Sequence, residues 1–247
     1  MENNKQLIIA GPCAVEKKEQ FDKIVQDIYH DTDVIRAGVW KGRTSPIDYP
    51  GIGEKGLPWL QEVQKKYKIP VAIEIGTTKH LELALKYELS VFWIGARTTV
   101  NPFSVQELAE AIKGVDLELW VKNPIVADLK LWSGAINRFK KIGLRNIKAI
   151  HRGFHTEHET IYRNNPRWEL LEKFKNYHPD IPIICDPSHI AGNYRYIYQI
   201  AQKAIDKNLN GLMIEVHNNP EKALSDKKQQ LNPKNFNKLL KKLKYPT

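Results

Sequence analysis

Residues 90–112 read SVFWIGARTTVNPFSVQELAEAI and hold one complete strand-loop-helix unit. The run SVFWI is short and apolar, which predicts a buried β-strand over residues 90–94. After a loop, Val105, Leu108, Ala109 and Ile112 follow at the i, i+3, i+4, i+7 spacing of an amphipathic helix. A strand followed by a helix is the repeating unit of α/β proteins with a parallel sheet.

The same alternation recurs along the whole chain. Helical stripes lie between most of the apolar runs, and Pro166 after Asn165 predicts the first turn of another helix. The eight expected strands cover residues 7–10, 34–37, 69–73, 90–94, 117–121, 147–150, 181–185 and 212–214. Eight units in 247 residues predict a single-domain (β/α)8 TIM barrel, a fold of about 250 residues. The alternative, a doubly wound sheet of six strands, leaves two units unexplained.

Composition excludes several classes of protein. The chain is 42% hydrophobic and 27% charged, as globular proteins are. No apolar run approaches the roughly 18 residues of a membrane span, and the N-terminus lacks a signal-peptide pattern. Two cysteines cannot form a disulfide framework, so we expect a cytoplasmic protein. The net charge of +10 comes without a basic stripe interleaved with aromatics, so we expect neither a nucleic-acid nor a membrane partner.

Charged side chains follow the expected strands, where barrel enzymes carry their catalytic residues. The third strand ends at Glu74. Guanidinium groups bind phosphate and carboxylate in a bidentate manner, and lysine adds a point charge. The density of cations therefore predicts a phosphorylated carboxylic acid beside a second phosphate. The cations that follow these strands are Arg36, Lys41, Arg43, Arg97, Lys122 and Arg152.

A second set of strand-end residues carries metal-binding groups. Cys13, His189, Glu215 and Asp226 offer a thiolate, an imidazole and two carboxylates. This set suits a divalent ion such as Mn²⁺, Fe²⁺, Co²⁺ or Zn²⁺. The four residues lie far apart in sequence, so the prediction depends on closure of the barrel.

Two other patterns suggest sites that we do not expect. Residues 51–56, GIGEKG, match a dinucleotide-binding fingerprint, but that fingerprint should directly follow a strand. His155 and His158 resemble part of a zinc site, but they lie in a segment without cysteine. We interpret the glycines as a loop leading into a helix, and the histidines as part of a solvated loop.

Seven motifs resemble one enzyme family, the 3-deoxy-7-phosphoheptulonate (DAHP) synthases of the short barrel type related to 3-deoxy-octulosonate 8-phosphate synthases. The similarity covers residues 7–243. The stretches GARTTVNPF, VKNP and AIHRGF resemble the subgroup often fused to chorismate mutase. The seven motifs are IIAGPCAVE, RAGVWKGRTSP, WIGARTT, VKNP, IHRGF, ICDPSHIAGN and IEVHNNPEKALSD.

The resemblance implies that phosphoenolpyruvate condenses with erythrose 4-phosphate and water to give DAHP and phosphate, the first step of the shikimate pathway. It implies catalytic roles for Lys41, Cys13 and His189, and it makes Lys41, between the two substrates, a candidate for proton transfer. We expect neighbouring cations to lower the pKa of Lys41. The residues implied at phosphoenolpyruvate are Arg36, Lys41, Glu74, Ala96, Arg97, Lys122 and Arg152, those at erythrose 4-phosphate are Arg43 and Thr44, and those at the metal, first of all Mn²⁺, are Cys13, His189, Glu215 and Asp226.

The chain departs from the family at Gly42, where proline is usual, so we expect a less ordered loop around Lys41 and Arg43. Octulosonate synthases typically have KANRSS where this chain has KGRTS, so Arg43 and Thr44 favour the four-carbon sugar. Two alternatives stay open: the octulosonate reaction with arabinose 5-phosphate, and a non-catalytic barrel that acts as a regulatory partner.

We also expect a homo-oligomer, either a dimer or a tetramer, and a separate chorismate mutase as a partner. Within residues 1–247 we expect the catalytic barrel alone. The first strand begins near residue 7 and the sequence stops at 247, so we expect neither an N-terminal regulatory domain nor a mutase domain.

Overall fold

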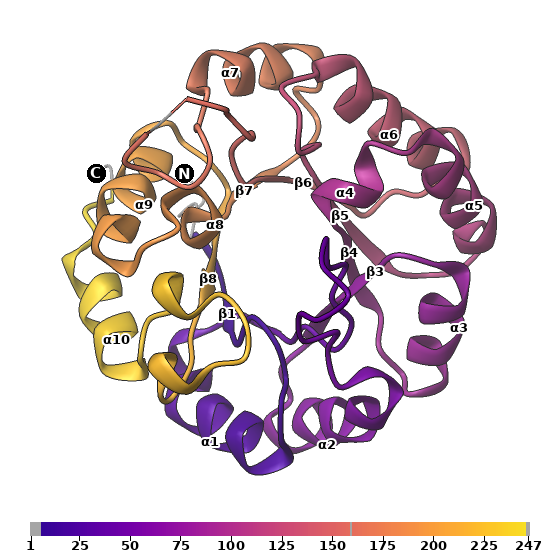
Figure 1. Ribbon diagram of the computed structural model, residues 1–247. Helices are drawn as coiled ribbons and strands as arrows, with labels where there is room; N and C mark the ends of the chain where they lie inside the picture. The colour runs from indigo at the N-terminus through magenta and orange to yellow at the C-terminus, as the bar shows by residue number, and fades with distance from the viewer. Residues whose placement is uncertain (1–5, 159, 246–247) are drawn as a thin grey trace.

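Eight parallel strands close into a barrel in the computed structural model, which describes residues 6–158 and 160–245 (Figure 1). The strand order is sequential, and β1 pairs with β8 to close the ring. The predicted TIM barrel is therefore confirmed. The strands are β1 (Leu7–Gly11), β2 (Val34–Arg36), β3 (Val71–Ile75), β4 (Val91–Ile94), β5 (Glu118–Lys122), β6 (Ile147–His151), β7 (Ile183–Cys185) and β8 (Gly211–Glu215).

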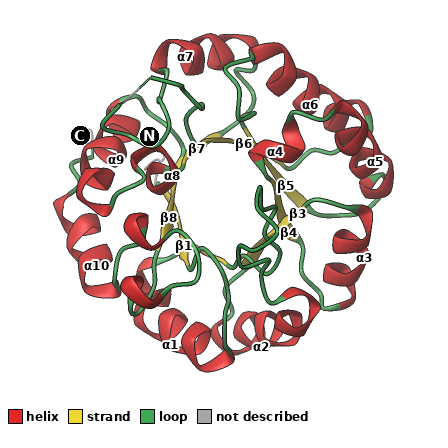
Figure 2. Ribbon diagram, in the orientation of Figure 1, coloured by secondary structure: helices red, strands yellow, loops and turns green. Residues whose placement is uncertain are grey.

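A ring of helices surrounds the strands (Figure 2). Two short helices, α4 (Ala96–Thr99) and α8 (Pro187–Ala191), directly follow β4 and β7. None of the described helices is long and apolar enough to cross a membrane. The outer helices are α1 (Lys18–Ile28), α2 (Leu57–Tyr67), α3 (Thr78–Lys86), α5 (Pro102–Ile112), α6 (Leu129–Lys141), α7 (Trp168–Tyr177), α9 (Ile197–Asp206) and α10 (Pro233–Lys242).

Strand β4 shows how the core is divided into an inner and an outer layer. In β4, Val91 and Trp93 point into the barrel and join its inner apolar cluster. Phe92 and Ile94 point outward and join the layer between strands and helices. The alternation follows from the pleat of a strand, because successive side chains point to opposite faces.

One helix was not predicted, and one begins later than predicted. In helix α3, Leu81, Leu83 and Leu85 alternate along the sequence, so the residues do not show a clear helical spacing. Helix α7 begins at Trp168 and not at Pro166. Arg167 has a left-handed backbone with φ of 40°, and a left-handed residue cannot continue a right-handed first turn.

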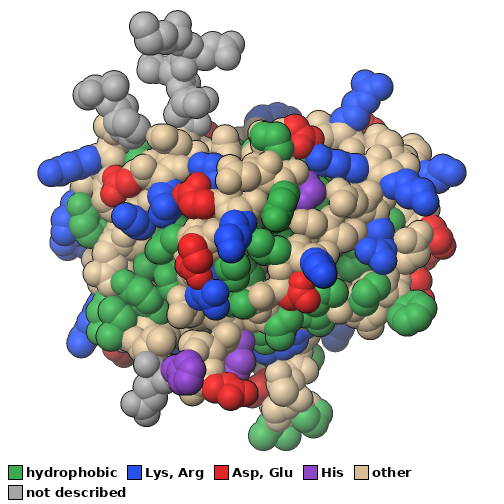
Figure 3. All heavy atoms as spheres, turned by 90° about the horizontal axis from the view of Figure 1, so that it is seen from above, with side chains coloured by type: hydrophobic (Ala, Val, Ile, Leu, Met, Phe, Trp, Pro, Cys, Tyr) green, Lys and Arg blue, Asp and Glu red, His purple; other side chains and the backbone are tan. Residues whose placement is uncertain are grey.

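The outer surface carries charges of both signs (Figure 3). On the face shown, Lys and Arg side chains are scattered among Asp and Glu, and they do not form a stripe.

The packing of α5 predicts the cost of removing one core side chain. Leu108 is 1% exposed and packs in the outer core, whereas Glu107 beside it is exposed. Leu108→Ala should lower the free energy of unfolding by about 2–5 kcal/mol, because it leaves a cavity. Glu107→Ala should change it by less than about 0.5 kcal/mol. Urea unfolding followed by circular dichroism measures both, and equal effects would contradict the predicted helix face.

Candidate active site

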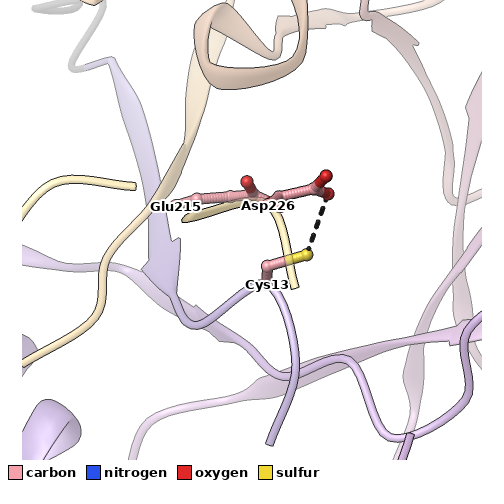
Figure 4. Close-up of side chains that lie close together, drawn as sticks. All are labelled: Cys13, Glu215 and Asp226. Carbon is pink, nitrogen blue, oxygen red and sulfur yellow. Dashed lines mark hydrogen bonds between the residues drawn. The ribbon is translucent and has the colours of Figure 1, made fainter. Parts of the chain in front are cut away.

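Three side chains from the two ends of the chain meet where β1 lies beside β8 (Figure 4). Cys13 follows β1, Glu215 ends β8 and Asp226 lies in the next loop, and ligand atoms of the three lie within 4.8 Å of one another. The Sγ of Cys13 donates to Asp226 Oδ2 at 3.2 Å. The Nε2 of His189, from α8, lies 3.8 Å from Glu215 Oε1 and 3.9 Å from Asp226 Oδ2. The barrel thus brings together all four predicted metal-binding residues.

The donor set of these four residues fits a divalent cation. Burial, and then the Glu215 carboxylate, raise the pKa of the Cys13 thiol. Glu215 Oε1 is buried without a hydrogen bond, although Arg36 Nη2 lies 3.0 Å away. A divalent cation would offset the crowded negative charge and coordinate this oxygen. Within residues 6–158 and 160–245, this is the one cluster of at least three His, Cys, Asp or Glu with such geometry, and His155 and His158 are outside it.

Asp186 orients the imidazole of His189. Its Oδ1 accepts from the backbone N–H of His189 at 3.0 Å, and its Oδ2 lies 2.8 Å from His189 Nδ1. The other ring nitrogen therefore faces the two carboxylates, which is how a carboxylate orients a metal-binding histidine. Burial acts to raise the pKa of Asp186, but His189 and Lys122 outweigh burial and hold this pKa well below its usual range.

Beside the metal-binding cluster lies a cleft of about 290 Å³. Six of its lining residues are Lys or Arg and three are Asp or Glu, so the cleft suits an anion of several charges. Cys13, Arg36 and Glu215 are the predicted site residues that do not line the cleft, and they are buried. The predicted residues on its wall are Lys41, Arg43, Thr44, Glu74, Ala96, Arg97, Lys122, Arg152, His189 and Asp226.

The cations of the cleft are held in different ways. Lys122 is buried at the end of β5, and its Nζ pairs with Asp186 Oδ2 at 3.1 Å. Arg152 Nη1 donates to Asn164 Oδ1 at 2.9 Å, and burial lowers the pKa of Arg152 to about 10. Arg97 is exposed, and its Nη2 donates to Thr44 Oγ1 at 3.2 Å. The deep cations are therefore held by buried polar partners, whereas Arg97 bonds to a loop residue.

Trp93 lies beneath the buried cations and was not among the predicted site residues. Its Nε1 donates to Glu74 Oε2 at 3.1 Å. The Arg36 guanidinium lies 5.4 Å and Lys122 Nζ lies 5.8 Å from the ring centroid, within the range of cation–π attraction. Gly95 leaves room for the Glu74 carboxylate, because a Cβ there would lie 2.3 Å from Glu74 Oε1.

The expectation that the pKa of Lys41 is lowered is wrong. Burial does act to lower it, but Cys13, Glu74 and Glu215 outweigh burial, and the pKa of Lys41 is raised. Lys41 Nζ donates to Cys13 O at 3.0 Å and to Cys13 Sγ at 3.2 Å. The Lys41 side chain therefore points to the metal-binding cluster. The sequence does not show where this long side chain points.

Other site residues were also missed. Ser225 Oγ lies 2.9 Å from Cys13 Sγ and accepts from Arg43 Nη2 at 2.7 Å. Arg163 lines the cleft and donates to Asp226 Oδ1 at 2.8 Å. Arg163 lies between β6 and α7, in residues 152–167. The length of that connection was a usable signal, since long βα loops commonly carry functional residues.

Comparison of the sequence with protein families gives a match along nearly the whole chain. The profile of the DAHP synthetase I family matches residues 2–246. A phospho-2-dehydro-3-deoxyheptonate aldolase of Thermotoga maritima is 32% identical over 238 residues, which are 96% of this chain and 68% of that protein. A 2-dehydro-3-deoxyphosphooctonate aldolase of Fusobacterium nucleatum is 24% identical over 260 residues, 95% of this chain and 88% of that protein.

Solved structures show the same barrel. The crystal structure of the Thermotoga maritima phospho-2-dehydro-3-deoxyheptonate aldolase (DAHP synthase) superposes with a TM-score of 0.85 at 28% identity, over 97% of this chain and 68% of that one. A truncated form of the 3-deoxy-D-arabino-heptulosonate 7-phosphate synthase of the same organism gives a TM-score of 0.81 at 27% identity, over 97% of this chain and 85% of that one.

The buried pair of Arg36 and Glu215 predicts a stability difference between two cations of the site. Arg36 is 1% exposed, so Arg36→Met leaves a buried carboxylate without its cation and should cost about 3–5 kcal/mol of unfolding free energy in metal-free protein. Arg97→Met removes an exposed cation and should change stability by less than about 0.5 kcal/mol. Urea unfolding in chelator measures both, and an unchanged Arg36 variant would refute the role of the pair.

Proposed function

Because this chain belongs to the DAHP synthetase I family, we propose that its cleft condenses phosphoenolpyruvate with erythrose 4-phosphate in a metal-dependent reaction. The family makes it an enzyme of DAHP-forming aldol-type condensation. One observation carries the choice of substrates: six cations line a cleft that adjoins the cluster of Cys13, Glu215 and Asp226. A phosphorylated carboxylate and a sugar phosphate would supply anionic groups that offset the excess of cations over acidic residues in this cleft.

Phosphoenolpyruvate binds on the Trp93 side of the cleft in this proposal. Lys122 and Arg152 bind its anionic groups from below, and Arg97 covers them from α4. The backbone N–H of Ala96 adds a donor at the start of the same short helix. Arg36 remains beneath them with Nε and Nη1 free of hydrogen bonds among the described residues, and it adds positive charge to the site.

Erythrose 4-phosphate binds at the loop after β2. Arg43 and Thr44 lie on the cleft wall in this loop. Arg43 Nε donates to Tyr49 O at 2.8 Å, so the guanidinium is oriented before a ligand arrives. This loop would direct the aldehyde end of the sugar towards the cluster of Cys13, His189, Glu215 and Asp226.

In the reaction, C3 of phosphoenolpyruvate forms a bond to the aldehyde carbon, and the aldehyde oxygen takes a proton. Water then adds at C2 and loses one proton, which replaces the proton given to the aldehyde oxygen. The hemiketal hydroxyl loses its proton as the C2–O bond to phosphate breaks, and this leaves the C2 carbonyl of DAHP and free phosphate. Lys41, whose Nζ lies beside Cys13 at the edge of the metal-binding cluster, donates the proton to the aldehyde oxygen. The fixed cations stabilise the charge that develops on the phosphate.

Cys13, His189, Glu215 and Asp226 would hold the divalent ion. When bound there, the ion supplies Lewis-acid polarisation of the aldehyde oxygen. Mn²⁺ is the first choice for a set of mixed sulfur, nitrogen and oxygen donors that includes two carboxylates, with Fe²⁺, Co²⁺ and Zn²⁺ as alternatives.

The proposal predicts a substrate-dependent and metal-dependent consumption of phosphoenolpyruvate. Protein stripped with chelator should be inactive and should regain activity with Mn²⁺, but only when erythrose 4-phosphate is present. The measurement is loss of the enol absorbance together with release of phosphate. Arabinose 5-phosphate is the matched control, and equal or faster turnover with it would assign the octulosonate reaction instead.

Cys13→Ser serves as the control for the metal. This variant should fold and should lose the activation by Mn²⁺, because a hydroxyl is a much poorer ligand than a thiolate. Turnover that persists in excess chelator, or no turnover with any of the four ions, would contradict the proposed chemistry.

Gly42 predicts a separate effect on the sugar phosphate. A Cβ at Gly42 would meet nothing within 4 Å, and its φ is not in the left-handed region. Gly42→Ala should reduce the conformational freedom of the loop that carries Lys41 and Arg43. The free-energy cost of ordering this loop around the sugar phosphate should fall by about 0.4–1 kcal/mol. The KM for erythrose 4-phosphate should fall about twofold to fivefold. The KM for phosphoenolpyruvate should fall less, because Lys122 and Arg152 lie outside this loop. Steady-state kinetics with each substrate varied checks this, and an equal change in both constants would contradict it.

A further inference from the structure

Each carboxylate of the metal-binding cluster is held from outside through one of its two oxygens. Asp226 Oδ1 accepts from Arg163 Nη1 at 2.8 Å, while Oδ2 faces Cys13 Sγ at 3.2 Å (Figure 4). Glu215 Oε2 accepts from Gln229 Nε2 at 2.7 Å, while Oε1 lies 3.0 Å from Arg36 Nη2 on one side and 3.8 Å from His189 Nε2 on the other. One oxygen of each carboxylate therefore remains directed into the cluster.

Arg163 also fixes the orientation of the Gln229 amide. The same nitrogen, Arg163 Nη1, donates to Gln229 Oε1 at 2.8 Å. A guanidinium is only a donor, so the amide must turn its oxygen to Arg163 and its NH₂ to Glu215. The reversed amide would set oxygen against carboxylate and NH₂ against guanidinium. Gln229 is 1% exposed, so water has little access to satisfy a reversed amide.

The backbone beneath Arg163 is pinned to α8, which carries His189. Arg163 N donates to Ala191 O at 3.2 Å, and Asn164 Nδ2 donates to His189 O at 2.7 Å. Gly192 packs so tightly against this segment that a Cβ there would lie 2.2 Å from Arg163 Cβ. The Arg163 side chain thus extends from a fixed base, although 46% of its surface is exposed.

We propose that Arg163 is a positioning residue that sets both carboxylates for the divalent ion, Asp226 directly and Glu215 through Gln229. The inference rests on the metal dependence proposed above. A ligand set that is already ordered loses less conformational freedom on binding, and removal of an outer hydrogen-bond partner typically costs about 10- to 100-fold in metal affinity. Arg163 also lines the cleft, so metal affinity measured without substrate is the readout that separates this role from a substrate contact.

The test is a Co²⁺ titration of the full chain, stripped of metal, in the absence of substrate. The thiolate-to-cobalt absorbance reports binding at Cys13. Arg163→Met should weaken Co²⁺ binding about 10- to 100-fold, and Arg163→Lys should recover part of this loss because lysine keeps a charged donor. Arg167→Met is the matched control from the same loop, since Arg167 pairs with Glu169, and it should bind Co²⁺ as the unchanged chain does.

A double variant tests the path through Gln229. Arg163→Met and Gln229→Met act on one chain of hydrogen bonds, so the double variant should lose less affinity than the product of the two single losses. A full product would show that the two residues act independently and would overturn the assignment of Gln229 as the link.

Two results distinguish failure of the inference from failure of the proposed function. Co²⁺ binding by Arg163→Met within twofold of the unchanged chain, with the same absorbance, would overturn the role of Arg163 alone. Absence of the thiolate band in the unchanged chain would overturn the metal site and this inference together. Circular dichroism and thermal unfolding establish that each variant is folded, and Arg163→Lys carries the test if Arg163→Met does not fold.

Discussion

The pairing of β1 with β8 is the interaction on which the candidate site depends. Gly11 lies opposite Glu215 in that register, so Cys13 meets residues some two hundred positions later in the chain. Cys13, Glu215 and Asp226 come together only through this pairing, because they lie at opposite ends of the chain. Closure of the barrel has a high cost in chain entropy, and the apolar layers inside and outside the strands offset it. The clustered carboxylates therefore lie at the end of a strand pair that is packed between the inner and the outer apolar layers.

A group of cations and a group of acidic residues lie next to each other in the site, and ion pairs join them. Arg36 pairs with Glu215 and Lys122 pairs with Asp186, and each pair joins the cationic side to the acidic side. Trp93 lies under both cations and also holds Glu74. Buried charges are costly unless they are paired, so these two pairs lower the cost of burying charged groups beneath the cleft. An anionic substrate on one side and a divalent cation on the other would complete the neutralisation.

The strands and the main helix faces could be predicted because alternation and helical periodicity are local signals. Helix α3 was not predicted, because Leu81, Leu83 and Leu85 alternate along the sequence and hide its helical spacing. The site residues at strand ends could be named because the barrel orders these ends around one rim. Three features could not be predicted: the raised pKa of Lys41, the position of Trp93 beneath the cations and the contact of Arg163 with Asp226. Each depends on where a long side chain points once the barrel has closed, and the sequence does not show this.

A crystal soaked with Mn²⁺ and phosphoenolpyruvate, measured at the manganese absorption edge, tests the central claim most directly. The account predicts a single strong anomalous peak between Cys13, His189, Glu215 and Asp226, with the phosphate and carboxylate groups of the ligand on Arg97, Lys122 and Arg152. A manganese peak elsewhere, such as at His155 and His158, or phosphoenolpyruvate bound away from these three cations, would contradict it.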